Sequence, residues 1–219
     1  MNDIRKVIAI IGGTGGLGSA LAFRLGRAGY KVLIGSRTES KAQYSANELN
    51  NRLGENILSG YVNLQAVKKA EIIILTIPFS NHDVIIEEIK EEVQGKIVVD
   101  TTVPLVPPKV SRVQLPLGGS IAKLAQEKLG QNVRLVSAFQ NVAATSLMSE
   151  DNVKGEVLVC GNNVDARSEV ISLIESIGLK GWHAGPIDNS VVTESLTSVL
   201  IFLNKRYKLS GSGISIVEH

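Results

Sequence analysis

Val7-Ile8-Ala9-Ile10-Ile11-Gly12-Gly13-Thr14-Gly15-Gly16-Leu17-Gly18 carries the strongest structural signal in this sequence. An apolar, β-branched run leads directly into a turn made almost entirely of glycine. An amphipathic stretch follows at once, because apolar residues recur at helical spacing through Leu21, Leu25 and Ala28. The sequence therefore predicts a strand, a tight turn and a helix in immediate succession.

Three of these glycines, Gly13, Gly15 and Gly18, match the pattern G-x-G-x-x-G. In that pattern the first glycine permits a tight turn, the second lets the backbone approach a pyrophosphate, and the third lets helix and strand pack closely. The helix also offers free N–H groups and the positive end of its dipole to phosphate. A glycine triplet alone is weak evidence, but strand, turn and helix occur here in order. We therefore predict a dinucleotide site, with Thr14, Gly16 and Leu17 completing the binding turn.

The end of the expected second strand, Tyr30–Ser36, indicates which dinucleotide is bound. Folds that prefer NAD carry an acid here to hold the ribose 2′-hydroxyl, and this chain has none. It has Ser36 and Arg37 instead, with Lys41 one helical turn further on. Arg37 can grip a 2′-phosphate bidentately and Lys41 adds a point charge. The alternative is two solvated basic residues at a helix start, where they oppose the helix dipole, so NADP is favoured over NAD.

The remainder of the chain alternates apolar runs with amphipathic stretches, which predicts an α/β fold of the Rossmann type. We expect a doubly wound, mostly parallel sheet with a smaller C-terminal α/β portion. Further strands are expected at Glu71–Ile77, Lys96–Asp100, Val133–Ala138, Glu156–Cys160 and Lys180–Ala184. Helices are expected at Thr38–Leu53, Leu64–Lys69, Asp83–Val93, Ile121–Leu129, Val164–Ile177 and Asn189–Tyr207. Residues 1–140 would form the NADP-binding domain and 141–219 the smaller portion closing the second-substrate site, with a soft boundary.

Composition narrows the class of protein. The chain has 219 residues, 44% of them hydrophobic and 20% charged, with a net charge of +2. That charge is too small to argue for a nucleic-acid or membrane partner. The single cysteine, Cys160, cannot form an internal disulfide, and no Cys/His spacing resembles a metal site. No stretch reads as a signal peptide or a membrane span, so a cytoplasmic location is expected.

The loops after the central strands are candidates for the second half of the site, because doubly wound sheets bind ligands at the carboxyl ends of their strands. Ile77 ends one such expected strand and Pro78 follows it, and the two could wall the nicotinamide or adenine side. A proline that merely ends a strand is an equal alternative. Ser120 is expected to cap the helix that follows it. His82 is expected to neighbour a helix N-terminus rather than to act as a catalyst.

Acid–base machinery is missing from the sequence. No tyrosine is followed by a lysine four residues on, and the candidate loops carry Thr, Pro, Val, Gln and Asn. A redox enzyme with such loops would position its hydride acceptor rather than exchange protons with it, so no catalytic side chain is assigned. A second organic cofactor fits that description. The alternatives are a flavin, an imine or a small carbonyl substrate, and a non-catalytic NADP sensor.

Motifs spread over nearly the whole chain resemble those of the F420-dependent NADP reductases, which pass a hydride between NADPH and the deazaflavin coenzyme F420. The similar segments are Ile11–Gly18, Gly35–Arg37 with Lys41, Leu75–Pro78, Lys96–Val99, Val136–Ala138, Val159–Gly161, Ala184–Pro186 and Glu194–Thr197. Together these motifs are specific, although the glycine turn alone is not.

This resemblance implies roles for individual residues. Thr14, Ser36, Arg37 and Lys41 would hold the 2′-phosphate, and Ile77 and Pro78 would border the nicotinamide. The deazaflavin would lie against Val103, Pro104 and the loop after Ala138, which contains Gln140 and Val142. The segment 211–214 would close over it. The family commonly has a histidine where this chain has Gln140.

The stretch Val191–Leu203 is too apolar to be fully exposed. It either completes the core or forms a two-fold interface. We predict a homodimer on this basis.

Overall fold

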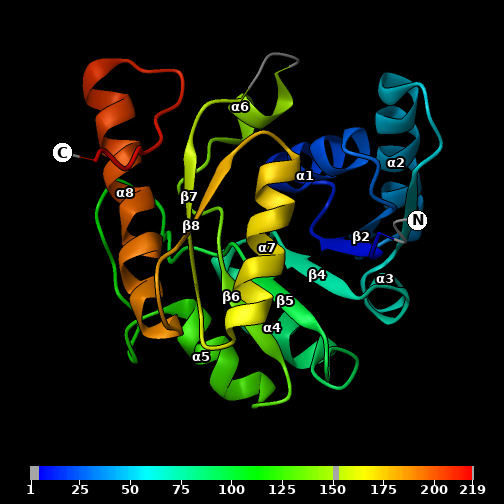
Figure 1. The fold of residues 1–219 in the computed structure, drawn as a ribbon, viewed down its shortest axis with the longest axis horizontal. Helices are drawn as coiled ribbons and strands as arrows, with labels where there is room; N and C mark the ends of the chain where they lie inside the picture. Colours follow the sequence, from blue (N-terminus) through cyan, green and yellow to red (C-terminus); the bar gives the residue numbers. More distant parts are fainter. Residues whose placement is uncertain (1–4, 150–152, 219) are drawn as a thin grey trace.

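A computed structural model describes residues 5–149 and 153–218. Eight strands form one sheet in the order β3-β2-β1-β4-β5-β6-β7-β8 (Figure 1), which confirms the predicted Rossmann-type fold. The strands are β1 (Ile8–Ile11), β2 (Val32–Ser36), β3 (Leu58–Val62), β4 (Ile72–Leu75), β5 (Ile97–Asp100), β6 (Arg134–Ser137), β7 (Glu156–Gly161) and β8 (Lys180–His183). The pairs from β3 through β6 are all parallel, so their carboxyl ends meet at one edge of the sheet.

Helices cover both faces of this sheet, and the central strands are apolar on both sides for that reason. One face is covered by α1 (Gly16–Arg27), α2 (Glu39–Leu53), α6 (Ala144–Met148) and α7 (Val164–Ser176). The other is covered by α3 (Asn63–Lys69), α4 (Phe79–Ile89) and α5 (Ile121–Leu129). A 3-10 turn (Ile187–Asn189) leads into α8 (Ser190–Tyr207), which runs beside α5 and along the left side of Figure 1.

Three local features of the structure differ from the sequence prediction. The strand β3 was not predicted, because Gly60 interrupts its apolar pattern. Gly60 is required by packing, since a Cβ there would lie 2.3 Å from the carbonyl carbon of Ala42 on α2. The helix expected at Asp83–Val93 begins earlier, at Phe79 directly after Pro78, and ends at Ile89. The short helix α6 was also missed.

Other local expectations are confirmed. The helix after Ser120 spans Ile121–Leu129, and the Ser120 side chain accepts a hydrogen bond from the N–H of Lys123 at 3.2 Å. Cys160, which has no cysteine partner in the sequence, is fully buried in β7.

The last two strands continue the sheet with a change of direction. β7 runs antiparallel to β6 through the pairs Val136–Gly161 and Ser137–Cys160, and β8 is parallel to β7. The amino end of β7, at Glu156, therefore lies on the edge where β1, β4, β5 and β6 have their carboxyl ends. Because β7 runs antiparallel to β6, the chain after residue 140 lies next to the carboxyl edge, where the second-substrate site is predicted.

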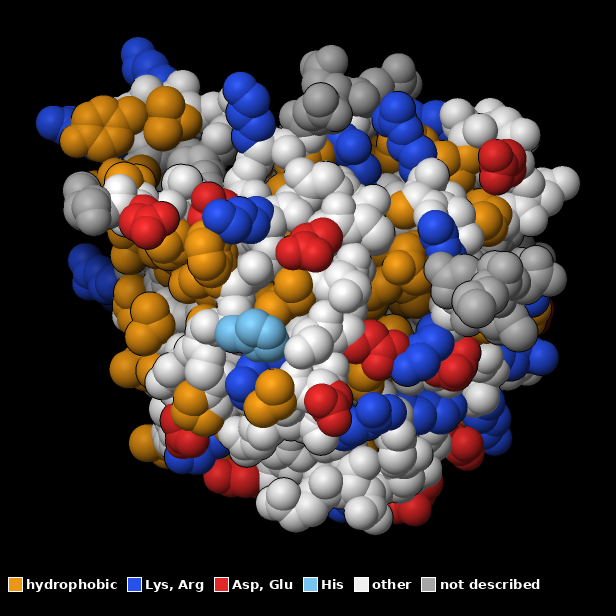
Figure 2. Space-filling view, viewed as in Figure 1, with side chains coloured by type: hydrophobic (Ala, Val, Ile, Leu, Met, Phe, Trp, Pro, Cys, Tyr) orange, Lys and Arg blue, Asp and Glu red, His pale blue; other side chains and the backbone are white. Residues whose placement is uncertain are grey.

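The helix α8 packs against the body mainly through polar side chains. Ser190, Thr193, Glu194 and Ser198 are buried together with Leu200. By contrast, Val192, Val199 and Phe202 are 62%, 44% and 54% exposed, and their spacing places them on one helix face. Figure 2 shows apolar side chains gathered on the left side of the molecule, where α8 runs. Within the residues described, no helix is long and apolar enough to cross a membrane.

Candidate functional site

The glycine turn joins β1 to α1 at the carboxyl edge of the sheet. Gly12 has a left-handed φ of +81°, so the tight-turn role that the pattern gives to Gly13 belongs to Gly12. Gly13 is restricted by space instead, because a Cβ there would lie 2.8 Å from the carbonyl oxygen of Ile10. Gly15 is the N-cap of α1 and is exposed. With no side-chain oxygen at that cap, the first N–H groups of α1 face outward and suit a phosphate.

Gly18 gives the close helix–strand packing that the pattern predicts. A Cβ at this position would lie 2.6 Å from the carbonyl oxygen of Gly12 and 2.5 Å from Thr76 Oγ1. Thr76 itself follows β4 and donates from Oγ1 to the carbonyl of Ile11 at 3.0 Å. A Cβ added to Gly16, by contrast, would meet nothing within 4 Å. Thr14 and Leu17 are half-buried beside these glycines.

The end of β2 lies next to this turn. Ile11 is paired with Gly35, and the carbonyl of Gly35 accepts from the N–H of Gly13 at 3.2 Å. Ser36 is the last residue of β2 and is buried, whereas Arg37 and Lys41 are exposed at the start of α2. The fold thus brings the two basic side chains to the same edge as the glycine turn. An anion bound there would be met by fixed backbone donors and by side chains free to adjust.

The ends of β4 and β5 form the middle of the edge. Ile77 lies beside the glycine turn, because its Cγ2 would be 3.1 Å from a Cβ added to Gly12. Pro78 is exposed and is the N-cap of α4. After the neighbouring strand β5, Val103 is half-buried and Pro104 is buried, within a turn in which the Leu105 N–H donates to the Val103 carbonyl at 2.7 Å. The predicted nicotinamide and deazaflavin walls therefore follow adjacent strands.

The loop after β6 is the last part of the edge. Phe139 has a φ of +71°, a conformation that costs a bulky residue on the order of 1–3 kcal/mol and that tends to occur at functional sites. Gln140 is buried, and its Nε2 donates to the carbonyl of Asp100 at 2.9 Å and to Ser137 Oγ at 2.8 Å. Its Oε1 is buried and has no hydrogen-bond partner in the part of the chain described. Gln140 is thus fixed against β5 with one acceptor still available.

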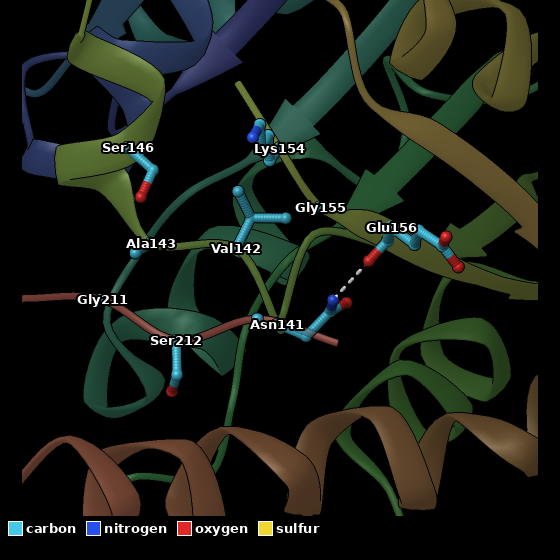
Figure 3. A pocket seen from close by; sticks show the side chains of 10 residues that line it. Asn141, Val142, Ala143, Ser146, Lys154, Gly155, Glu156, Gly211 and Ser212 are labelled. Atoms are coloured by element: carbon cyan, nitrogen blue, oxygen red, sulfur yellow. Dashed lines mark hydrogen bonds between the residues drawn. The ribbon is translucent and has the colours of Figure 1, made fainter. Parts of the chain in front are cut away.

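A small hollow of about 50 Å³ separates this loop from the C-terminal segment (Figure 3). Val142 lines it, together with Asn141, Ala143, Ser146, Lys154, Gly155, Glu156 and residues 211–213. Asn141 points across it and donates from Nδ2 to the carbonyl of Glu156 at 2.6 Å. The segment 211–214 therefore lies against the loop after β6, next to Val142.

The Glu156 side chain holds the C-terminal segment in that position. Its carboxylate accepts from the N–H of Ile216 and from Trp182 Nε1, each at 2.7 Å, and from Ser215 Oγ at 3.0 Å. The Ile216 bond is the main cause that lowers the pKa of Glu156 below its ordinary value. The segment is thus fixed by a carboxylate at the amino end of β7.

A buried polar cluster behind the edge was missed by sequence reasoning. His82 is not a neighbour of the cap but lies inside α4, 2% exposed, with Nε2 2.7 Å from Asp100 Oδ2. Glu194 on α8 is equally buried, and its two oxygens accept from the N–H groups of Ile121 and Ala122 at 2.8 and 3.0 Å. Burial raises the pKa of Glu194 to about 7. One pattern in the sequence could have revealed that His82 is buried. It precedes the buried Ile85, Ile86 and Ile89 by three, four and seven residues, a helical spacing that places it on the same face of α4.

Other reactive chemistry is sparse. Burial raises the pKa of the Cys160 thiol to about 11, which leaves it a poor nucleophile. Among the residues described, no group of three His, Cys, Asp or Glu side chains could hold a metal ion. The edge therefore offers surfaces and hydrogen bonds for two ligands rather than a set of reacting side chains.

Comparisons with known proteins agree with this geometry. Residues 7–104 match the family model described as NADP oxidoreductase, coenzyme F420-dependent. An F420-dependent NADP reductase of Methanocaldococcus jannaschii is 39% identical over 96% of this chain and 98% of its own length. One of Methanothermobacter thermautotrophicus is 32% identical over 96% of this chain and 94% of its own.

Solved structures share the fold. A crystal structure from Arthrobacter sp. FB24, proposed to be of an F420-dependent NADP reductase, superimposes with a TM-score of 0.78. It covers 97% of this chain and 99% of its own at 21% identity, which supports the fold alone. The near full-length likeness to the two archaeal enzymes carries more weight. On that likeness, this chain belongs to the F420-dependent NADP reductase family.

Proposed function

We propose that this protein transfers a hydride between NADP(H) and the deazaflavin coenzyme F420. The observation that carries the proposal is the 39% identity, over nearly the full length of both chains, with a protein named F420-dependent NADP reductase. The geometry supports it, because the carboxyl edge offers a phosphate-binding turn on one side and a second set of loops on the other.

The glycine turn fits the NADP half. A side chain at Gly13 or Gly18 would meet backbone atoms of β1 or of the turn itself, so these glycines keep the turn compact at the N-terminus of α1, as the dinucleotide-binding pattern requires. We propose that NADP binds along Gly13, Thr14, Gly15, Gly16, Leu17 and Gly18, with its nicotinamide against Ile77 and Pro78. Ser36, Arg37 and Lys41, with Thr14, would hold the 2′-phosphate, and the exposure of both basic side chains supports this role.

The loops after β5 and β6 fit the deazaflavin half. We propose that the ring lies against Val103, Pro104, Gln140 and Val142, with segment 211–214 beside it. Buried polar atoms without a partner among the described residues gather there: Thr102 Oγ1, Gln140 Oε1 and Asn141 Oδ1. Since buried polar groups normally have hydrogen-bond partners, these atoms support a polar ligand at this place.

This proposal gives each part of the chain a separate role. Residues 1–140 would form the NADP-binding domain, and residues 141–219 would close the second site. With both substrates bound, the hydride would pass directly between the two rings and the reduced deazaflavin would take its proton from solvent, so no side chain is assigned to carry one. The chain's own residues orient the rings and exclude water from between them.

A homodimer is proposed as well. The exposed Val192, Val199 and Phe202 form an apolar stripe on α8 that a second copy could cover. We also propose a cytoplasmic location, where a reductase would have access to the NADPH pool.

The test is a spectroscopic assay of the purified protein with F420 and NADPH, repeated with NADH. Loss of the visible deazaflavin absorbance with NADPH, and much slower loss with NADH, is expected. Binding of NADPH without any spectral change on adding F420 would overturn the proposal. A panel of flavins, imines and small carbonyl compounds would then identify another acceptor, and turnover with none of them would point to an NADP sensor.

A further inference from the structure

His82 and Asp100 form a buried ion pair that the proposed reaction does not use directly. His82 is 2% exposed and Asp100 is 1% exposed, and His82 Nε2 lies 2.7 Å from Asp100 Oδ2. The pair joins α4 to the carboxyl end of β5, in the middle of the sheet edge. Its position is central to the proposed site, although neither side chain faces solvent.

Stability alone does not account for such a pair. Two buried charges lose their hydration, and replacing a buried pair with apolar residues is often neutral or even stabilising. The rest of β5 is Ile97, Val98 and Val99, so an apolar residue at the end of the strand would suit the local packing. A different reason is needed for the carboxylate at position 100.

Asp100 holds both sides of the proposed deazaflavin site. Its Oδ1 accepts from the N–H of Thr102 at 2.9 Å, which fixes the turn leading to Val103 and Pro104. Its carbonyl accepts from Gln140 Nε2 at 2.9 Å, which fixes the loop after β6. His82 occupies the remaining carboxylate oxygen, so the direction of the Asp100 side chain depends on His82.

We propose that His82 is a positioning residue for hydride transfer. Paired with the Asp100 carboxylate, it fixes the 102–104 turn, while the Asp100 backbone carbonyl holds the Gln140 loop opposite, so the fit of the second substrate depends on His82. This inference rests on the proposed function, because it concerns the binding of F420. His82 touches neither substrate and acts through Asp100.

The surrounding charges favour the cationic form of His82. Burial is the largest single effect and lowers the pKa of His82, but the charges and hydrogen bonds of Asp100 and Asp83 together outweigh it, so the net shift is upward. On α4, Asp83 Oδ1 lies 3.8 Å from His82 Nδ1. The same Asp83 oxygen lies 2.7 Å from Lys128 Nζ on α5. From α8, Glu194 is close enough for its charge to interact with both members of the pair. His82 therefore stays charged to a higher pH than a free imidazole, and the site should loosen above that pH.

The test compares three variants in the NADPH–F420 assay. His82→Leu removes the donor, His82→Gln keeps an N–H donor without the charge, and Gln126→Leu is the control. Gln126 is also buried and bonds the carbonyls of Gly130 and Val133, away from the proposed site. All three are assayed for KM and kcat across pH, and for melting temperature.

We expect His82→Leu to raise the KM for F420 about tenfold while the KM for NADPH stays within about twofold. His82→Gln should restore only part of the affinity near neutral pH, because it keeps the donor and loses the charge. It should also abolish the alkaline rise in KM for F420 that the unchanged protein shows. Gln126→Leu should lower the melting temperature and leave both KM values unchanged.

Two results would overturn this inference and leave the proposed function standing. One is a lower melting temperature in both His82 variants with an unchanged KM for F420, which a purely structural pair would give. The other is the same rise in the KM for F420 at alkaline pH in His82→Gln as in the unchanged protein. If His82→Leu does not fold, His82→Gln and the pH profile of the unchanged protein still decide the question. Absence of F420 turnover by the unchanged protein would overturn the proposed function, and this inference with it.

Discussion

Thr197 Oγ1 donates a hydrogen bond to the backbone carbonyl of Gln140 at 2.7 Å, and this bond ties α8 to the loop after β6. The two residues lie on opposite sides of the boundary proposed near residue 140. The smaller C-terminal portion is therefore connected to the proposed deazaflavin site through side chains as well as through the sheet. Changes on α8 should reach the site by this route.

Replacing Arg37 with alanine should separate NADPH from NADH. Charge-assisted hydrogen bonds contribute on the order of 1.5–3 kcal/mol, so the KM for NADPH should rise roughly 10- to 100-fold. The KM for NADH should hardly change, because NADH has no 2′-phosphate. Steady-state kinetics with both nucleotides measure this. Lys31→Ala is the matched control, since Lys31 is exposed at the opposite end of the same strand region. Equal losses with both nucleotides would show that Arg37 does not read the phosphate.

Alanine at Gly18 and at Gly16 should have different effects. At Gly18 the new Cβ meets Thr76 Oγ1 and the Gly12 carbonyl at 2.5 and 2.6 Å, so the free energy of unfolding should fall by about 1–3 kcal/mol. At Gly16 it meets nothing within 4 Å, so stability should be kept. Urea denaturation of both variants measures the difference, and NADPH titration of the Gly16 variant measures crowding at the proposed pyrophosphate. The same loss of stability in both variants would contradict the packing described for Gly18.

Glu194 should make stability depend on pH in a predictable direction. Burial raises its pKa from 4.5 to about 7 in the folded chain, so folding takes up a proton between those values. The stability it contributes is therefore fully present below about pH 4.5 and is lost as the pH rises towards about 7, by up to about 3 kcal/mol. Glu194→Gln has no such group. Its stability relative to the unchanged protein should rise between about pH 5 and about pH 8 in urea denaturation, and a constant difference would refute the assignment.

The apolar stripe on α8 should mediate self-association. Light scattering after gel filtration should give twice the chain mass of 23.4 kDa. Phe202→Glu should shift the protein to the monomer, because a charge in an apolar interface is costly to bury. Val164→Glu is the control, since Val164 is 58% exposed on α7, away from the stripe. A monomeric unchanged protein would remove the dimer proposal.

The sequence predicts features that depend on local patterns. The glycine turn, the Ser120 cap and the run Ile72–Leu75 could be recognised because each depends on a few consecutive residues. β3 could not, because Gly60 is set by the backbone of α2, which only the folded chain brings near.

The buried polar cluster of His82, Asp100 and Glu194 could not be predicted from the sequence for the same reason. A histidine near a helix start does not reveal that an aspartate eighteen residues later will bond to it. Likewise, the family resemblance singled out Gln140 in the loop after a strand. Its bond to the Asp100 carbonyl could not be predicted, because that bond depends on the pairing of β5 with β6. Contacts between distant segments are the part that sequence patterns did not supply.

The junction of β6 and β7 determines where this sheet should open first. Two residue pairs are in register there, whereas β4–β5 and β5–β6 each have four. Local opening follows the least protected boundary, so amide hydrogens of β7 should exchange with solvent sooner than those of β4. Gln140 follows β6 and Glu156 begins β7, so both lie on the same side of this junction, at the carboxyl edge of the sheet. Opening of this junction would therefore loosen the loop that carries Gln140, on which the proposed deazaflavin site depends.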